Sequence, residues 1–301
     1  MQAMLEHLNP APQAPARVVV IGAAGFVGKA VAARMERDGV SLLRITRDQA
    51  DLTAADAGTR LAALLRAGDA VVAVAARAPC KDADMLIENM AMARTMTRAL
   101  SAVEVAHVVN ISSDAVYADS PAPLSESSCA SPGSLHGAMH LAREVLFCSE
   151  LKAPLAVLRP SLLYGAGDPH NGYGPNRFRR LAAQGEEIVL FGEGEECRDH
   201  VFIDDVAELV ARVLYRRSRG TLNVATGAVY SFRAIAEKVV ALSGRSVTIR
   251  ATPRSGPMPH NGYRPFEITA CRNAFPDFRY TPLEEGLARA QREMQAKDHR
   301  G

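Results

Sequence analysis

The chain has 301 residues, 48% of them hydrophobic, which suits one large α/β domain or a nucleotide-binding domain with a smaller companion. The formal net charge is only +2, and acidic and basic residues are interspersed, which argues against a nucleic-acid or membrane surface. We find no apolar run of membrane-spanning length. Five cysteines lie far apart without CxxC spacing, a pattern typical of reduced thiols in a cytoplasmic protein.

Residues 1–16 are rich in Ala and Pro and predict a disordered leader rather than a signal peptide. From residue 17 the chain alternates strands and helices. The predicted strands are 17–21, 41–46, 70–75, 105–111 and 155–158, and the predicted helices are 26–37, 59–66, 87–103 and 135–149. Continuous runs of Val, Ile and Ala are typical of strands buried on both faces of a parallel sheet. The pattern predicts an α/β fold with a doubly wound parallel sheet, a Rossmann domain over residues 17–160.

The alternation ends after residue 160, where four glycines and two prolines within 163–176 predict a long loop. Helices are then expected at 177–184, 206–215, 232–242 and from 282, and strands at 187–191, 221–225 and 247–251. We expect residues 161–199 and 227–301 to form a smaller α/β substrate-binding part, while 200–226 return to the first domain. Ligands in such folds bind outside the carboxyl ends of the strands, so the second part is expected to cover that crevice.

Three glycines follow the first predicted strand in the sequence GAAGFVG, at Gly22, Gly25 and Gly28. A loop of this type makes a tight turn, lets the backbone approach a pyrophosphate, and allows close packing of the next helix. The amides at the start of that helix, around Phe26 and Val27, then face the phosphates. The spacing is GxxGxxG. Its position between a buried strand and a helix favours dinucleotide binding over an ordinary turn.

The choice of cofactor is expected to be made at the end of the second strand, where residues 46–48 read TRD. An acid at the strand tip favours the free ribose of NAD, whereas Arg47 suits a 2′-phosphate. We therefore expect NADP, with NAD as the alternative. The expected cofactor contacts outside the glycine loop are Thr46, Arg47, Asp51, Leu52, Ala75 and Ala76.

Further motifs follow in order: Asn89 in the long helix, ISSDAVY at 111–117, RPSLLYG at 159–165, and FGEGEECRDHVFIDDVA at 191–207. Together with the glycine loop they make the chain resemble the extended short-chain dehydrogenase/reductase superfamily, the NAD-dependent epimerase/dehydratase family of sugar-nucleotide enzymes. The resemblance covers about residues 17–290. It implies a nucleotide-sugar substrate, a nicotinamide cofactor, and a homodimer formed through the helix 87–103 and the helix that follows residue 134.

The resemblance also implies roles for individual side chains. Ser113 matches the residue that hydrogen-bonds the reacting sugar oxygen, with an ordinary strand-end hydroxyl as the alternative. Arg198 matches an arginine that holds the substrate diphosphate, where a guanidinium fork suits phosphate oxygens, with a surface charge as the alternative. Asp114 and Tyr164 are expected to contact the substrate. The pair at 204–205 is expected to cap the helix that follows.

The family's catalytic Tyr and Lys, four residues apart on one helix, are both replaced here, by His136 and His140. A neutral imidazole exchanges protons near pH 7, so His136 is a candidate acid/base, whereas His140 does not supply the fixed charge of lysine. A metal site is disfavoured, because Gly137 follows His136 and no third ligand is evident. The remaining alternative is that both histidines line an old site without a proton role.

Two functional hypotheses remain. The first is an NAD(P)-dependent epimerase or reductase acting on a nucleotide-activated sugar, with Ser113 and His136 at the reacting carbon. A dehydratase is disfavoured, because Ala115 stands where such relatives carry glutamate. The second is a catalytically silent dinucleotide-binding protein that serves as a sensor or assembly subunit.

Overall fold

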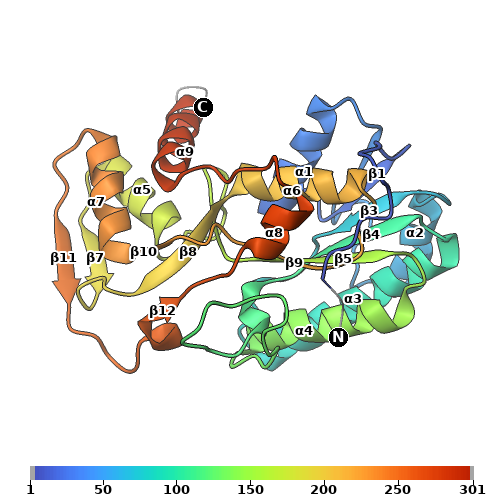
Figure 1. Cartoon of the computed structure of the whole chain (residues 1–301), viewed down its shortest axis with the longest axis horizontal. Coiled ribbons are helices and arrows are strands. Elements are labelled where there is room, and N and C mark those ends of the chain that lie inside the picture. The colour runs from blue at the N-terminus through green and yellow to red at the C-terminus, as the bar shows by residue number, and fades with distance from the viewer. Residues whose placement is uncertain (1–3, 299–301) are drawn as a thin grey trace.

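The computed structural model describes residues 4–298. Its main sheet consists of parallel strands in the order β2-β1-β3-β4-β5-β9. They are β1 (Val18–Ile21), β2 (Leu42–Ile45), β3 (Ala70–Ala73), β4 (His107–Ile111), β5 (Leu155–Pro160) and β9 (Gly220–Val224). Figure 1 shows this sheet on the right. The predicted doubly wound fold is confirmed.

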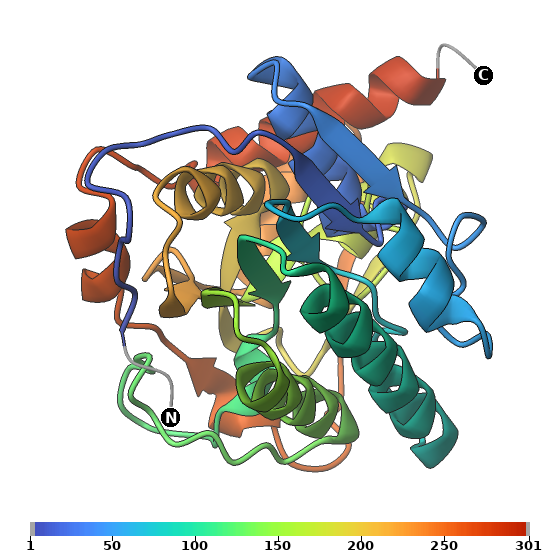
Figure 2. The same cartoon turned by 90° about the vertical axis from the view of Figure 1, so that its right-hand side faces the viewer.

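Helices cover both faces of the main sheet (Figures 1 and 2). On one face α1 (Phe26–Arg37) packs against α6 (Ile203–Tyr215), and on the other α3 (Ala83–Val103) packs against α2 (Ala57–Leu64) and α4 (Leu135–Glu150). Each face has its own apolar layer, because the strand side chains are buried alternately toward one face and the other. Within residues 4–298 no helix is long and apolar enough to span a membrane.

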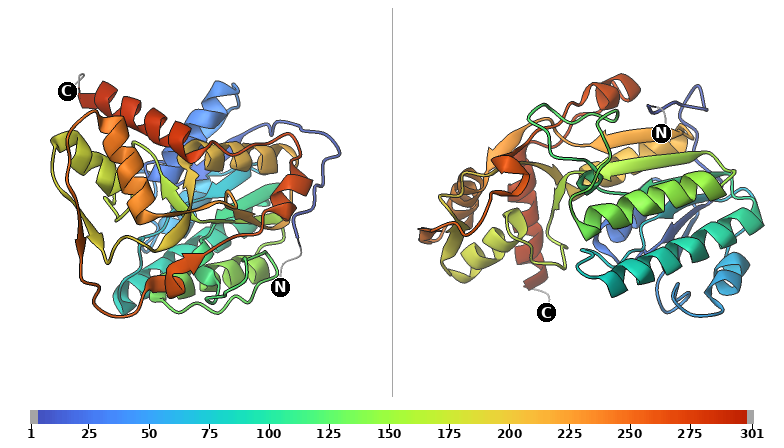
Figure 3. Two further views of the ribbon diagram at one scale, coloured as in Figure 1. Left: turned by 60° about the vertical axis from the view of Figure 1, so that its left-hand side comes forward. Right: turned by 90° about the horizontal axis from the view of Figure 1, so that it is seen from below.

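The smaller part of the chain is built on two short sheets. β8 (Cys197–Phe202) pairs with β6 (Leu162–Tyr164), β10 (Val229–Ser231) and β12 (Tyr263–Arg264), and β7 (Ile188–Phe191) pairs with β11 (Ile249–Thr252). Helices α5 (Pro175–Gln184), α7 (Phe232–Ser243) and α9 (Leu283–Asp298) pack around them, as Figure 3 shows for α7 beside α9. The short helix α8 (Thr269–Ala274) returns to β9.

Residues 4–16 do not form the disordered leader expected from their composition; residues 1–3 lie outside the described chain. The segment bridges to β9 and to the end of α6, with the Glu6 amide donating to the Arg219 carbonyl at 2.8 Å. The His7 ring lies 2.8 Å from the Ser218 hydroxyl and 2.9 Å from the Ala274 carbonyl. These long-range contacts outweigh a local composition that has little helix or strand preference.

The expected capping role of residues 204–205 is also wrong. Helix α6 begins one residue earlier, and the side chain of Asp205 instead accepts hydrogen bonds from the amide and hydroxyl of Thr281, at 2.9 and 2.8 Å. Asp204 forms an ion pair with Arg289 of α9. Both acids therefore attach the C-terminal helix to the rest of the fold.

A buried polar network fixes α4 to the sheet. Both carboxylate oxygens of Glu144 accept from the Arg159 guanidinium, at 3.0 and 2.6 Å, and Ser112 donates a further hydrogen bond. Arg159 also donates to the Tyr117 hydroxyl at 2.9 Å, and that hydroxyl donates to Asn223 of β9 at 2.6 Å. The network joins α4, β4, β5 and β9 at the carboxyl edge of the sheet.

Candidate active site

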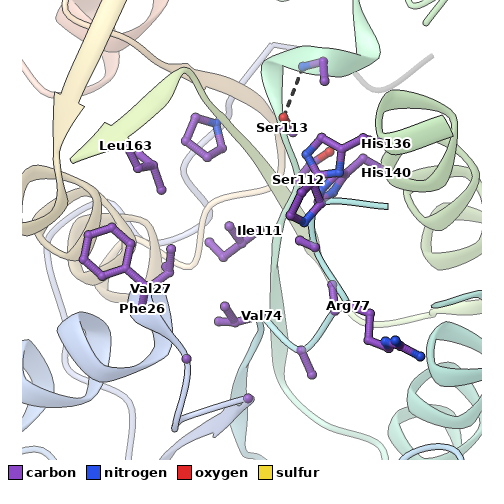
Figure 4. A pocket seen from close by; sticks show the side chains of 18 of the residues that line it. Phe26, Val27, Val74, Arg77, Ile111, Ser112, Ser113, His136, His140 and Leu163 are labelled. Carbon is purple, nitrogen blue, oxygen red and sulfur yellow. Dashed lines mark hydrogen bonds between the residues drawn. The ribbon is translucent and has the colours of Figure 1, made fainter. Parts of the chain in front are cut away.

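A cavity of about 920 Å³ lies at the carboxyl edge of the main sheet, where the smaller part covers it. Its lining includes the loops after β1, β2, β3 and β4, the start of α4, and residues from β6 and β8. In Figure 4, Phe26, Val27 and Leu163 form one wall, and Ser113, His136 and His140 form the opposite wall. The cavity therefore connects the glycine loop with the residues expected at the reacting carbon.

The three glycines of the loop have different physical roles. Gly22 adopts a φ of +95°, and a Cβ there would lie 2.7 Å from the amide of Ala75. A Cβ on Gly28 would lie 2.2 Å from the Gly22 carbonyl, so Gly28 allows α1 to approach the turn but does not line the cavity. Gly25 lines the cavity at the N-terminus of α1. A Cβ on Gly25 would lie 3.4 Å from its nearest neighbour, the Gly22 carbonyl oxygen. The space in front of Gly25 thus fits a pyrophosphate.

The other expected cofactor residues also reach the cavity. Its lining includes Phe26, Val27, Thr46, Arg47, Asp51, Leu52, Ala75 and Ala76. The Arg47 side chain is 78% exposed and donates to Asp51 at 3.1 Å. Hydrogen bonds from Thr53 and then from Arg47 lower the pKa of Asp51 to about 2. Because an exposed pair of this kind adds little stability, Arg47 is able to turn toward a phosphate at small cost.

The two histidines lie on one face of α4 with their rings 4.7 Å apart in an edge-to-face arrangement. The Cys80 amide donates to Nδ1 of His136 at 3.4 Å, which favours the tautomer with the proton on Nε2. Burial lowers the pKa of His136 below 6.5, and burial together with His136 and Arg143 lowers the pKa of His140 much further. Both rings are therefore neutral at pH 7, and neither replaces the charge of lysine.

Ser113 and Asp114 follow β4 after a single residue, Ser112. The Ser113 hydroxyl accepts from the Ala115 amide at 3.1 Å and lines the cavity. The Asp114 carboxylate is held by Arg264 at 2.9 Å and lies 3.8 Å from Arg198, which also lies 3.4 Å from Glu196. Asp114 and Arg198 line the cavity, but they are paired with protein groups.

The structure excludes Tyr164 from the site. Its side chain is 1% exposed, it packs against Phe202 in the core of the smaller part, and it does not line the cavity. A Cβ on Gly286 would lie 2.0 Å from its hydroxyl, so α9 covers the phenol directly. The expectation of a substrate contact was wrong because α9 and the apolar core of the smaller part enclose Tyr164 away from the cavity.

Two arginines near the site were missed from the sequence. Arg143 is fully buried and donates to the carbonyls of Ala73 and Ala75, at 2.7 and 3.0 Å, at the end of β3. Its spacing of three residues from His140 was a usable signal, because such residues share a helix face. Arg264 comes from β12, and no local pattern connects it with Asp114, 150 residues away. Among residues 4–298 no group of three or more His, Cys, Asp or Glu side chains is arranged to hold a metal ion.

The family model "NAD dependent epimerase/dehydratase family" matches residues 18–225. The chain belongs to this family. It is 31% identical over 142 residues to a dTDP-4-dehydro-6-deoxy-D-allose reductase of Streptomyces bikiniensis, an alignment covering 45% of this chain and 42% of that protein. It is 26% identical to a dTDP-6-deoxy-L-talose 4-dehydrogenase (NAD(P)(+)) of Kitasatospora kifunensis over 87% of this chain and 90% of that protein.

Solved structures of other proteins share the fold. UDP-glucose 4-epimerase of Thermotoga maritima, solved with UDP-glucose, gives a TM-score of 0.83 at 21% identity, covering 94% of this chain and 99% of that one. A GDP-L-fucose synthetase of Naegleria fowleri bound to NADP gives a TM-score of 0.83 at 16% identity, covering 100% of this chain and 98% of that one. At these identities the likeness shows the fold alone.

We expect Gly25→Val to abolish dinucleotide binding without unfolding the protein, because the backbone at Gly25 is ordinary (φ −76°) and the new side chain enters the cavity. Gly28→Ala is expected to destabilise the fold by about 1–3 kcal/mol, because its Cβ has no space beside the Gly22 carbonyl. Calorimetry with NADPH and urea unfolding separate the two effects. Gly58→Val, where the space around a Cβ is open, is the control; unchanged NADPH affinity in Gly25→Val would contradict the assignment.

Proposed function

We propose that the protein is an NAD(P)-dependent epimerase or reductase of a nucleotide-activated sugar. The observation that carries the proposal is one cavity that runs from Gly25, past Ser113 and His136, to Arg198. The family membership supports a nicotinamide cofactor. Two of the relatives are named for reactions of dTDP-sugars, and the Thermotoga maritima epimerase was solved with UDP-glucose, which supports the substrate class.

The dinucleotide is proposed to bind with its phosphates in front of Gly25 and its adenine between residues 46 and 53. When bound, the nicotinamide accepts or donates a hydride. The chain contributes the free amides at the start of α1 and the walls formed by Phe26, Val27 and Leu163. Arg47 at the end of β2 supports NADP over NAD.

Arg47→Ala is expected to weaken NADPH binding by about 1–2 kcal/mol, because a charge-assisted hydrogen bond to the 2′-phosphate is lost from an exposed site. NADH binding should change little. Calorimetry with both cofactors measures the difference. Arg44→Ala is the matched control, since Arg44 is an exposed β2 arginine that does not line the cavity. Equal losses for NADPH and NADH would show that Arg47 does not read the phosphate.

His136 and Ser113 are proposed to act on the reacting sugar oxygen. Reduction of the sugar carbonyl needs a proton for the oxygen, which the protonated ring of His136 supplies from Nε2, leaving a neutral ring with its proton on Nδ1. Oxidation is the reverse step, so it starts from this Nδ1 tautomer rather than from the one that the Cys80 amide favours, and Nε2 accepts the proton that leaves the sugar hydroxyl. The long 3.4 Å contact from Cys80 is weak enough to permit that change.

His136→Ala is expected to lower sugar oxidation by about 10²–10⁴-fold while NADPH affinity is retained, because general base catalysis is lost. In the parent, kcat/KM should fall as the pH is lowered through the His136 pKa, below 6.5, because protonation removes the accepting lone pair. Rate measurements from pH 5 to 8 test both points. A parent that binds NADPH but turns over no nucleotide sugar, with an indistinguishable variant, would favour the catalytically silent binding protein.

Arg198 is proposed to bind the substrate diphosphate. Its contacts with Glu196 and Asp114 are long, at 3.4 and 3.8 Å, so neither carboxylate holds the guanidinium in a bidentate grip. Arg264, in contrast, is engaged by Asp114, Asp119 and two backbone carbonyls. Arg198 is therefore the arginine with donors to offer a phosphate.

A homodimer through α3 and α4 is also proposed. Ile87 on α3 and Val145 on α4 are 68% and 61% exposed, which is unusual for large apolar residues on adjacent helices. The double variant Ile87→Asp with Val145→Asp should sediment as a monomer, whereas Leu242→Asp on α7 should not change the assembly. A parent that is already monomeric at micromolar concentration would contradict the proposal.

The cytoplasmic location stays a prediction, which cell fractionation would test.

A further inference from the structure

A small side chamber of about 130 Å³ lies beside the main cavity. The two spaces share four lining residues, which are Leu162, Leu163, Asp168 and His170. The remaining walls come from the loop before α5, from Asn176 at its start, and from His200 on β8. Because the lining is shared, a substituent of a ligand in the main cavity has a short path into the chamber.

Two buried side-chain atoms at this chamber have no hydrogen-bond partner. Nε2 of His200 belongs to a residue that is 4% exposed, and Oδ2 of Asp168 belongs to one that is 7% exposed. Buried polar atoms are rarely left unpaired, because each costs about 1–3 kcal/mol. A Cβ on Gly174, which has a φ of +116°, would lie 3.8 Å from Nε2. A side chain at Gly174 would therefore take up space beside this ring atom.

Both unpaired atoms are acceptors. Nδ1 of His200 lies 3.1 Å from the Arg198 carbonyl, which can only accept, so Nδ1 carries the ring proton and Nε2 carries a lone pair. Burial, and then the charge of Arg198, lower the pKa of His200 to about 3, so the ring stays neutral. The other oxygen of Asp168 accepts from the His170 amide at 3.3 Å. The chamber thus offers two lone pairs and requires a donor.

The donor must be neutral and small. Phosphate and carbonyl groups only accept, and the Asp168 carboxylate repels an anion. An ammonium group is disfavoured, because Arg180 already lies 3.9 Å from the same Asp168 oxygen. A hydroxyl group fits the charge and the size, and its one hydrogen supplies one of the two missing hydrogen bonds.

We propose that the side chamber formed by His200 and Asp168 binds a hydroxyl group of the substrate sugar and so selects among sugars, an inference that rests on the proposed function. Its position supports a sugar hydroxyl. Arg198 and His200 are two apart on β8, so their side chains leave the same face of the strand about 7 Å apart. In a nucleotide sugar the sugar is bonded directly to the diphosphate that Arg198 is proposed to hold. His200 also lies opposite Leu162 on β6, which lines both spaces.

The test measures binding of UDP-glucose, dTDP-glucose, their monodeoxy-fluoro analogues and UDP alone by calorimetry. Fluorine keeps the size of a hydroxyl but cannot donate. We expect one analogue to bind the parent about tenfold more weakly than the natural sugar, as for loss of one buried hydrogen bond. The His200→Phe variant should bind the natural sugar about tenfold more weakly than the parent does, and it should bind that analogue and the natural sugar equally well. Its affinities for UDP and NADPH should be unchanged.

His107→Phe is the matched control. His107 is also a buried histidine with one nitrogen on a backbone carbonyl, that of Ser218 at 2.6 Å, and the other nitrogen unpaired, but it starts β4 at the opposite edge of the sheet. Asp168→Asn provides a second variant if His200→Phe folds poorly, and the same selective loss is expected because one acceptor becomes a donor.

Three outcomes would overturn the inference. If His200→Phe and Asp168→Asn both bind every sugar as the parent does, the chamber holds only water. If the variants weaken UDP and NADPH as much as the sugars, His200 has only a structural role. If the parent binds NADPH but neither nucleotide sugar, the proposed function fails and the inference falls with it. The first two outcomes contradict the inference alone, because the parent still binds a nucleotide sugar in both.

Discussion

The buried ion pair between Glu144 and Arg159 determines how the site is assembled. Removing one partner of such a pair leaves an uncompensated charge and costs about 3–5 kcal/mol, so the pair is a strong geometric constraint. Glu144 belongs to α4 and Arg159 to β5, and Ser112 and Tyr117 extend the contact to the end of β4 and the loop beyond it. His136 lies about two turns before Glu144 on the same helix. The network therefore sets where the two histidines stand relative to Ser113.

The same helix also shows how the site differs from the Tyr and Lys arrangement of its family. His140 is buried and neutral, and no lysine lines the cavity among the described residues. A positive charge is nevertheless close by, because Arg143 lies one turn later, where it donates to the backbone carbonyls of Ala73 and Ala75 at the end of β3. Burial lowers the pKa of Arg143 to about 10, which leaves it charged at pH 7. Arg143 does not line the cavity, so its charge favours the neutral form of His140 but offers no direct contact to a ligand.

Whether the sequence predicted a feature of the fold or the site depends on how far apart in the chain its interacting residues lie. The strands of the main sheet and the glycine turn depend on neighbouring residues, so the turn at Gly22, Gly25 and Gly28 could be predicted from the spacing of the glycines and their position between a strand and a helix. Tyr164 was misplaced because its direction depends on α9, more than 100 residues later, where Gly286 covers the hydroxyl. The path of residues 4–16 depends likewise on contacts with α6, β9 and α8. Arg264 reaches Asp114 only through the closure of the smaller part over the sheet.

The distribution of charge along the cavity gives the last constraint. At the glycine loop the attraction for a bound phosphate would come from backbone amides and the dipole of α1, and the nearby guanidinium of Arg47 is exposed and paired with Asp51. At the other end Arg198 and Arg264 are surrounded by Asp114, Asp119 and Glu196. An anion that binds there must replace a carboxylate contact of Arg198, so its net gain is smaller than the contact alone provides. In the proposed mode of binding, discrimination between substrates then depends on the groups beside that arginine, where His200 lies.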